Sequence, residues 1–325
     1  MNVNDWPALP VAEWAPTKRS LHLYAQMLGK LRLALAPHQP NFVYTALQLT
    51  PRGLGTVAMP YGIRSVQATI DVFESLLLLE SSDGRQARIT LSGARTVAQV
   101  FSELHAGLDK LGIEVTLSPI PQEIPDLTPL ARDERPAVFE PLDAQRWLAV
   151  LTAANAVFDR WRSHFFGRTG LQLWWGAFDL ALLLFSGKHV DPPANRGYLL
   201  KYDLDAEMLN AGFYPGDAGS EAYFYGYIYP QPAAGATIAI APAQASWSTA
   251  LGEWVLPYEA VRTADDPEDA LKWAESIGTP AERDGFTQNL LVRWMRNDPA
   301  SASSYVQAST TLTDEQKARL LKIAQ

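Results

Sequence analysis

The stretch that most constrains this chain is an apolar run between Gly170 and Gly187, which reads GLQLWWGAFDLALLLFSG. Asp179 is the only charged side chain within it. The run is at the short end for a membrane span, carries an acid near its middle and is rich in glycine and aromatic residues. We therefore expect a pair of buried strands here and no passage through a membrane.

Asp179 is the residue in this run that needs a physical explanation. Burying an unpaired carboxylate costs several kcal/mol, so Asp179 must be hydrogen-bonded, paired or protonated. The period of two in a strand puts Ala177 and Ala181 on the same face, where their small side chains leave room for a ligand or a neighbouring residue. Two interpretations stay open. Asp179 is either a catalytic acid or base, or a structural carboxylate held by an arginine, a tyrosine hydroxyl or backbone amides.

The composition excludes several classes of function. The 325 residues contain no cysteine, which removes disulfides, thiolate catalysis and cysteine-based metal sites. The formal net charge of -8, without a basic block, argues against nucleic acid as a partner. The five histidines lack metal-ligand spacing, and no glycine-rich nucleotide loop or nucleophile elbow is present. We expect no metal and no cofactor. The N-terminal MNVNDWPALP lacks the pattern of a signal peptide, so cytoplasmic residence is the expectation.

The pattern of apolar residues predicts an α+β fold with two lobes, each a helix followed by mostly antiparallel strands. In the first lobe, residues 1–117, Ser20 is a plausible N-cap for a helix over 21–36. The remaining elements are strands between 42 and 91 with a hairpin turn at 82–84, a helix over 96–111 and a strand over 113–117. A strap over 118–142, with six prolines, leads to the second lobe.

The second lobe is predicted to cover residues 143–265. Its helix is expected over 143–166, and a rigid turn after a short helix is expected at 212–216. Its strands are expected at 171–175, 178–186, 198–203, 222–229, 236–241 and 252–256.

The last segment, residues 266–325, has a different pattern. Asp266-Pro267 followed by Trp273 recurs as Asp298-Pro299 followed by Tyr305, and helix-forming stretches follow each copy. Such a period predicts helical hairpins of a repeat-like extension, on which a protein partner could dock. Four unrelated terminal helices are the alternative.

A strand of alternating tyrosines is the second candidate for chemistry. In EAYFYGYIYP, alternate residues point to opposite sides, so four tyrosine rings share one face: Tyr223, Tyr225, Tyr227 and Tyr229. Phe224, Gly226 and Ile228 face the other side, and the first three tyrosines are the candidate ligand contacts. Such a face suits a sugar, an aromatic ring or a peptide, although a half-exposed strand with one apolar side gives the same pattern. The carboxylates of Glu221 and Glu253 could share this cleft, where Glu253 and Asp179 would be the catalytic acid and base.

The first helix supplies a third set of candidates. His22, Gln26 and Lys30 follow one another at intervals of four, on a stripe separate from the leucines. A histidine, an amide and an ammonium in line could bind an anionic ligand, but a solvated helix face has the same pattern. Together with Trp174 and Trp175 as walls, these residues complete the predicted ligand site.

Several motifs together resemble a bacterial family known only as a domain of unknown function. They are LHLYAQMLGKLRL, TPRGL, MPYG, WWGAFDLALLLFSG, AGFYPGD, FYGYIYPQP and LGEWVLPYEAVR, in this order over about residues 6–265. The resemblance implies one continuous unit that contains both lobes, and it implies no activity. Phe42 and Val43 stand where the family pattern has His and Trp, which weakens any histidine-centred site there. The segment after Pro267 also departs from the single terminal helix of the family.

The sequence thus leaves two functional hypotheses. In the first, a small molecule binds in an aromatic, acid-lined cleft, with cofactor-free acid–base chemistry as an extension. In the second, the chain is a non-catalytic interaction module that docks a protein partner through residues 266–325.

Overall fold

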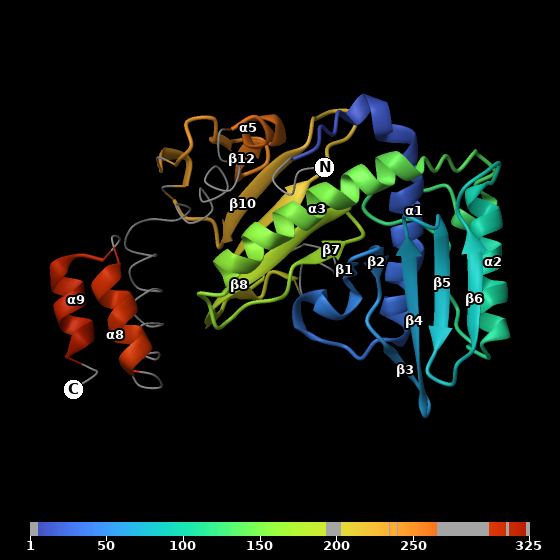
Figure 1. Cartoon of the computed structure of the whole chain (residues 1–325), viewed down its shortest axis with the longest axis horizontal. Coiled ribbons are helices and arrows are strands. Elements are labelled where there is room, and N and C mark those ends of the chain that lie inside the picture. Colours follow the sequence, from blue (N-terminus) through green and yellow to red (C-terminus); the bar gives the residue numbers. More distant parts are fainter. Residues whose placement is uncertain are drawn as a thin grey trace.

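The computed structural model describes residues 6–192, 203–233, 235–238, 240–264, 299–309 and 312–322. Within these ranges the fold is α+β, with two antiparallel sheets and several helices (Figure 1). The helices are α1 (Val11–Leu35), α2 (Val97–Lys110), α3 (Pro141–Arg162), α5 (Tyr258–Arg262), α8 (Pro299–Ala308) and α9 (Asp314–Leu321). Three short 3-10 helices are η1 (Pro40–Thr45), η2 (Leu130–Arg132) and η3 (Gly235–Thr237).

The first sheet has the order β1-β2-β4-β5-β6, with β3 paired to β4. Its strands are β1 (Gln48–Thr50), β2 (Gly53–Gly55), β3 (Met59–Tyr61), β4 (Arg64–Asp71), β5 (Leu76–Ser81) and β6 (Gln86–Thr90). The hairpin predicted at 82–84 is the turn between β5 and β6, where Gly84 has the positive φ of 86° that favours glycine. The strand predicted over 113–117 does not form, since Ile113 and Leu117 are buried without a partner strand.

The second sheet has the order β11-β12-β10-β9-β8-β7. Its strands are β7 (Gln172–Trp174), β8 (Asp179–His189), β9 (Ala206–Tyr214), β10 (Tyr223–Tyr229), β11 (Ser246–Ser248) and β12 (Glu253–Pro257). The apolar run is therefore the predicted strand pair, β7 with β8. Within the parts of the chain that are described, no helix has the length and apolar character needed to cross a membrane.

The central strand β9 differs from its prediction. Residues 212–214 belong to this strand, which pairs with both β8 and β10, and no short helix precedes a turn there. Of the strand predicted over 236–241, residues 236–237 belong to η3, residues 238, 240 and 241 form no strand, and residue 239 lies outside the described residues. Of the strand predicted over 198–203, residues 198–202 lie outside the described residues.

Helix α1 begins ten residues earlier than predicted. Ser20 is inside the helix, where its hydroxyl donates to the Pro16 carbonyl at 3.3 Å, and so it is not the N-cap. Pro16 removes one helical hydrogen bond. The helix nevertheless extends to Val11 because Trp14 is fully buried against Trp147 of α3, with ring centroids 6.2 Å apart. Tertiary packing outweighs the local cost of the proline.

Helix α2 follows its predicted bounds closely. Thr96 and Gln99 form a reciprocal capping box at its start. Gly112, with φ of 68°, follows its C-cap Leu111. Local sequence determines this helix, so its ends could be predicted.

One hydrophobic core runs through both predicted lobes. A single cluster of buried side chains includes Leu28 of α1, Ile70 of the first sheet and Phe213 of the second. Leu47 and Leu173 also exchange backbone hydrogen bonds of 2.9 and 2.8 Å, which join the first half of the chain to β7. The boundaries of the predicted lobes and strap therefore stay a prediction, whereas the shared core is observed.

The C-terminal extension is described only in part. Asp266, Trp273 and the rest of 265–298 lie outside the described residues, so the predicted repeat and its helical hairpins stay a prediction. In α8 and α9, Val306 and Leu320 are buried. A protein partner on residues 266–325 therefore remains an expectation from the sequence.

Candidate functional site

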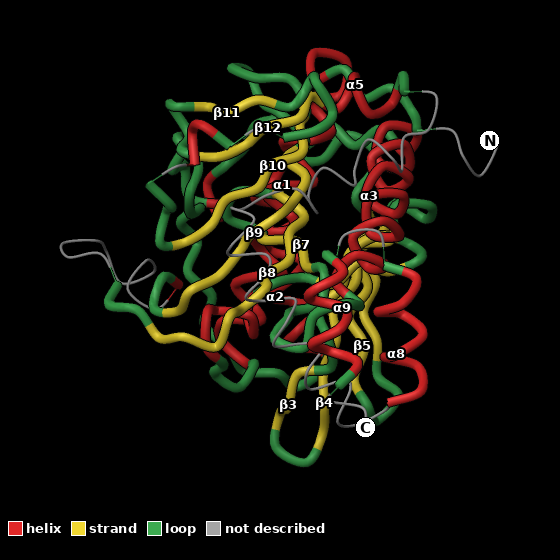
Figure 2. Tube along the Cα trace, turned by 90° about the vertical axis from the view of Figure 1, so that its left-hand side faces the viewer, coloured by secondary structure: helices red, strands yellow, loops and turns green. Residues whose placement is uncertain are grey.

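A cavity of about 810 Å³ lies on one face of the second sheet. Helix α3 covers the opposite face, where Phe224 packs against Phe158 with ring centroids 6.2 Å apart (Figure 2). Because neighbouring residues in a strand point to opposite faces, the tyrosines on either side of Phe224 face the cavity. The lining is Leu33, Phe42, Thr45, Gln122, Glu123, Trp174, Trp175, Gly176, Ala177, Asp179, Leu183, Asp203, Asn210, Tyr214, Tyr223, Tyr225, Tyr227 and Glu253.

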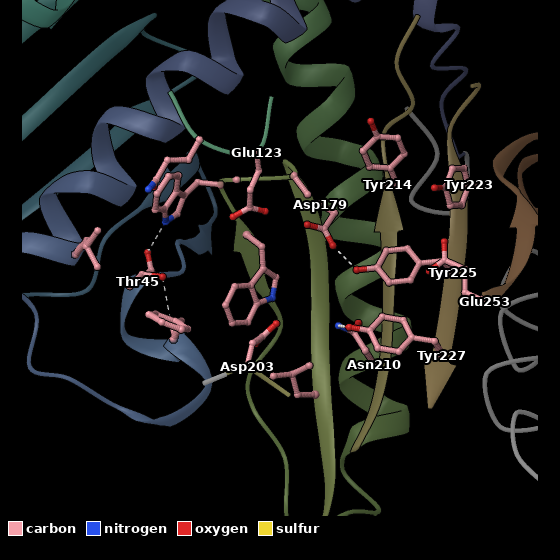
Figure 3. A pocket seen from close by; sticks show the side chains of 18 residues that line it. Thr45, Glu123, Asp179, Asp203, Asn210, Tyr214, Tyr223, Tyr225, Tyr227 and Glu253 are labelled. Carbon is pink, nitrogen blue, oxygen red and sulfur yellow. Dashed lines mark hydrogen bonds between the residues drawn. The ribbon is translucent and has the colours of Figure 1, made fainter. Parts of the chain in front are cut away.

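The structure brings together most of the predicted site residues. The lining includes the two predicted catalytic acids, both predicted tryptophans and the three predicted tyrosines (Figure 3). Four predicted ligand contacts lie outside it, namely His22, Gln26, Lys30 and Glu221. Phe42 is also part of the wall.

Asp179 is held by a tyrosine hydroxyl. Tyr225 Oη donates a hydrogen bond to Asp179 Oδ2, and Figure 3 shows the ring reaching across from β10. The ring passes over β9 at Gly212, where an added Cβ would lie 2.7 Å from the Tyr225 hydroxyl. A residue without a side chain is therefore needed between the two partners. Asp179 has no ion pair with a lysine or arginine of the described chain.

The environment of Asp179 favours its protonated form. Its side chain is 8% exposed. Burial raises the pKa of Asp179 to about 6, and the negative charges of Glu123 and Asp203 act in the same direction. The hydrogen bond from Tyr225 opposes this shift without cancelling it. The carboxyl can therefore exchange a proton near neutral pH.

Glu253 is the second acid on this face. Val255 pairs with Tyr225, so Glu253, two residues earlier on β12, points to the same side of the sheet. Burial, followed by the charge of Asp179, raises the pKa of Glu253 to about 7. Two carboxyl groups with different pKa values thus share one wall.

Two further acids were not predicted from the sequence. Glu123 comes from the proline-rich strap, where its φ is 58°, and its carboxyl fills the space beside Gly176. Asp203 precedes β9, and burial followed by the charge of Glu123 raises its pKa to about 6. Desolvation also raises the pKa of Glu123. Neither residue belongs to a motif, so only the folded arrangement of the loops identifies them.

His22 positions the wall instead of lining it. Its Nε2 lies 3.0 Å from the Trp175 carbonyl and 2.9 Å from that of Gly176, and because both are acceptors, Nε2 carries the proton. Burial lowers the pKa of His22 to about 4, so the imidazole is neutral. Because α1 begins at Val11, His22 lies in the interior of the helix and not at its end.

Gln26 and Lys30 hold the strap against α1. Gln26 Nε2 donates to the Gln122 carbonyl at 2.7 Å, and the Gln122 amide donates to Gln26 Oε1 at 3.0 Å. Lys30 Nζ donates to the Ile120 carbonyl at 2.6 Å. Burial lowers the pKa of Lys30 to about 8. These side chains therefore place Glu123 at the cavity by fixing the backbone around it.

The other predicted residues have distinct surroundings. Trp175 Nε1 donates to the Thr45 carbonyl at 3.1 Å, which ties the wall to η1. Trp174 Nε1 is buried without a hydrogen-bond partner in the described structure. Glu221 is exposed before β10, where its carboxylate accepts a long bond of 3.4 Å from the Val11 amide.

The role of Gln26 gives a testable prediction. We expect Gln26→Leu to lower the free energy of unfolding by about 2 kcal/mol, because it leaves the amide and carbonyl of Gln122 without partners in a partly buried place. Urea denaturation measures this loss. Gln86→Leu, on the exposed side of β6, is the matched control and should change stability by less than about 0.5 kcal/mol. Equal effects of the two substitutions would contradict the assignment.

These observations define an α+β protein of two antiparallel sheets with buried aromatic clusters and an acid-lined cavity on the second sheet. Among the residues whose placement is described, no group of three or more histidine, aspartate or glutamate side chains could hold a metal ion. The chain belongs to a family described as "Family of unknown function (DUF5996)", whose model matches residues 6–277. The resemblance seen in the sequence is thereby confirmed. No curated protein and no solved structure matches the chain.

Proposed function

We propose that this protein binds a small polar or aromatic molecule in the cavity of the second sheet. One observation carries the proposal: Asp179 of β8, Glu253 of β12 and three tyrosines of β10 all line the same cavity of about 810 Å³. Pockets for small ligands have volumes of roughly 300–1,000 Å³ and combine apolar walls with a few polar groups. The rings of Trp174 and Tyr223 supply such walls.

We further propose that the cavity performs acid–base chemistry without a cofactor. Asp179 accepts a hydrogen bond from Tyr225, which favours its carboxylate, so it is the better base. Glu253, with a pKa of about 7, retains its proton at neutral pH more often and is the better acid. This assignment fits proton abstraction and return on a bound ligand, and it requires no metal or nucleotide.

A thermal-shift screen tests the binding proposal. Sugars, organic acids, amines and aromatic metabolites are added to the full chain at pH 7, and a ligand of the cavity should raise the melting temperature in a saturable way. If no compound of any class does so, the binding proposal fails.

A tryptophan substitution shows where a compound that stabilises the protein in this screen, called the hit below, binds. We expect Trp174→Leu to weaken the binding of the hit at least about tenfold, because the substitution removes ring area from the cavity wall. It breaks no hydrogen bond, since Trp174 Nε1 has none in the described structure. Trp247→Leu is the control: this half-buried ring packs on Trp254 at 4.9 Å and does not line the cavity. Isothermal titration of the three proteins gives the affinities, and equal weakening by both substitutions would place the ligand elsewhere.

The chemical step has a separate readout. In D2O, the bound hit should exchange a carbon-bound proton for deuterium, observed by NMR. Asp179→Asn and Glu253→Gln should abolish the exchange even at ligand concentrations that saturate each variant. Binding without exchange in the natural protein would leave a binding protein and refute the catalytic proposal.

A further inference from the structure

We propose that the ligand of this cavity is an organic cation: an amine, amidine or guanidine carried on an apolar or aromatic body. This proposal rests on the proposed function, because it names the class of molecule that the same cavity takes. It is argued from the charge, the rings and the unpaired polar atoms of the wall.

The charge of the wall is one-sided. Glu123, Asp179, Asp203 and Glu253 all line the cavity, whereas no lysine, arginine or histidine of the described chain does so. The charges of Glu123 and Asp203 raise the pKa of Asp179, and the charge of Asp179 raises the pKa of Glu253. A cation placed among these groups would relieve the repulsion, while an anion would increase it. The wall therefore selects against acids and for positive charge.

The aromatic rings add a second attraction for a cation. Tyr214, Tyr223 and Trp174 present ring area at the wall, and ring faces attract ammonium and guanidinium groups. The protein already uses this interaction at the edge of the site. Lys18 Nζ lies 5.5 Å from the centre of the Tyr214 ring, and Lys30 Nζ lies 5.6 Å from that of Trp175, although neither lysine lines the cavity.

Two polar atoms of the wall residues are buried without a hydrogen-bond partner in the described structure, the acceptor Asn210 Oδ1 and the donor Trp174 Nε1, and the acceptor bears on the class of ligand. Asn210 Oδ1 is buried without a hydrogen-bond partner in the described structure, while the amide nitrogen of the same side chain donates to Tyr227 at 3.1 Å. A buried acceptor without a donor costs about 1–3 kcal/mol, which an N–H group of a ligand would offset. An ammonium or amidinium has donors only and matches this atom.

The placement of the acids favours an organic cation over a metal ion. Figure 3 shows Glu123, Asp179 and Asp203 spread along the wall, with Glu253 on the tyrosine side. Within the described part of the chain, no three acidic or histidine side chains converge as a metal site requires. Acids that surround a cavity of this volume instead suit a cation with an extended body.

Matched probes test the charge directly. The full-length protein is titrated at pH 7.5 with tryptamine, with tryptophol, in which a hydroxyl replaces the ammonium, and with the anion indole-3-acetate. We expect tryptamine to bind at least tenfold more tightly than tryptophol, and indole-3-acetate to show no saturable binding. We also expect the affinity for tryptamine to rise about tenfold from pH 5.5 to 7.5, as the acids of the wall ionise while the amine stays charged. The titratable groups around Asp179 are Glu123 from the strap, Asp203 before β9, Glu253 from β12 and Tyr225 from β10, and Tyr225 keeps its proton throughout this range because burial and the charge of Asp179 raise its pKa.

Variants that replace an acid by its neutral amide test whether the preference for tryptamine depends on the acids of the cavity wall. Glu253→Gln should lower the affinity for tryptamine at least tenfold and leave the affinity for tryptophol unchanged. Asp203→Asn serves as a second variant if Glu253→Gln does not fold. Glu221→Gln removes the same charge before β10 but outside the cavity, so tryptamine affinity should not change.

The outcomes separate the two proposals. If tryptophol or indole-3-acetate binds as tightly as tryptamine or more tightly, and Trp174→Leu weakens that binding, the ligand is not required to be a cation. The cavity would then remain the binding site. If tryptamine binds but no substitution in the cavity weakens its binding, the proposal that this cavity binds an organic cation is refuted. No saturable binding by any probe would refute the cation as the ligand class, and the wider screen would then decide whether the cavity binds anything.

Discussion

At pH 7.5, Asp179→Asn is expected to raise the free energy of unfolding by about 1–3 kcal/mol. The natural chain must either ionise this carboxyl inside the protein or hold its proton against the solution. Burial raises the pKa of Asp179 from 3.8 to about 6, and each pKa unit corresponds to about 1.4 kcal/mol. Asparagine keeps an oxygen that accepts the hydrogen bond from Tyr225 and removes the charge.

The sign of the pH dependence follows from the same shift. Between about pH 4 and pH 6 the folded protein keeps a proton on Asp179 that the unfolded chain has released, so the free energy of unfolding falls as the pH rises through this window. Asp179→Asn should therefore match the natural chain at pH 4 and exceed it at pH 7.5. The free energy of unfolding of Asp179→Asn should still fall in part as the pH rises, because the pKa values of Asp203 and Glu253 are also raised, to about 6 and about 7.

Urea denaturation followed by tryptophan fluorescence, at several pH values from 4 to 7.5, measures this effect. Asp109→Asn, an exposed aspartate of α2, is the control and should leave the slope unchanged. Loss of stability in Asp179→Asn at pH 7.5 would show that the charged carboxylate is structural. A more stable variant that no longer exchanges the proton of a bound ligand would show that the natural chain retains this acid at a cost in stability, as functional sites commonly do.

The sequence allowed much of the second sheet to be predicted. The alternation of Tyr223, Tyr225 and Tyr227 with Phe224 determines which side of β10 meets the core and which side meets the cavity. The isolated charge of Asp179 in an apolar run likewise indicated a carboxyl that needs a partner. A tyrosine hydroxyl was among the partners expected, but its identity as Tyr225 depends on strand pairing, which local sequence does not determine.

The surroundings of the polar stripe on the first helix could not be predicted from the sequence, for a physical reason. Gln26 is fully buried and Lys30 is 3% exposed, because α1 is enclosed on several sides by the core and the strap. The middle of this helix, residues 20–32, has no exposed residue, so a polar stripe there bonds to backbone groups of neighbouring segments. Only contacts over long sequence separation reveal this.

Glu123 and the strand β9 likewise could not be predicted from local sequence patterns. Glu123 reaches the cavity through the course of a proline-rich segment, which no periodicity describes. In β9, Asn210 and Gly212 weaken the pattern of a strand, and pairing on both sides makes these residues a strand nonetheless. Gly212 is also the residue over which Tyr225 reaches Asp179, so the feature that obscured the strand is one that the site requires.

The second large effect is expected at the contact between α1 and the cavity wall. A Cβ added at Gly29 would lie 2.3 Å from three atoms of the Trp175 ring, which real contacts do not allow. Overpacking of this kind costs about 1–3 kcal/mol, and the helix gains about 1 kcal/mol from alanine in place of glycine. Because the ring must move and its bond to the Thr45 carbonyl must break, we expect Gly29→Ala to lower the free energy of unfolding by about 2 kcal/mol.

The control for this prediction is another helical glycine. A Cβ at Gly107 in α2 would lie 2.8 Å from Cδ1 of Leu79, which is the movable end of a flexible side chain. Gly107→Ala should therefore cost less than Gly29→Ala. Urea denaturation of both variants gives the comparison, and a smaller loss for Gly29→Ala would contradict the rigid contact.

A double-mutant cycle separates this contact from a general intolerance of α1. Trp175→Ala alone should be strongly destabilising, by about 3–5 kcal/mol, since a buried ring is lost. In that background the obstacle to a Cβ is gone, so Gly29→Ala should stabilise the protein by up to about 1 kcal/mol through helix propensity. A change of sign between the two backgrounds would show that Gly29 exists to admit Trp175. Trp175 lines the cavity, and His22 and Gln26 of the same helix bind its carbonyl, so α1 sets the shape of the wall mainly through Trp175 and contributes Leu33 to the lining itself.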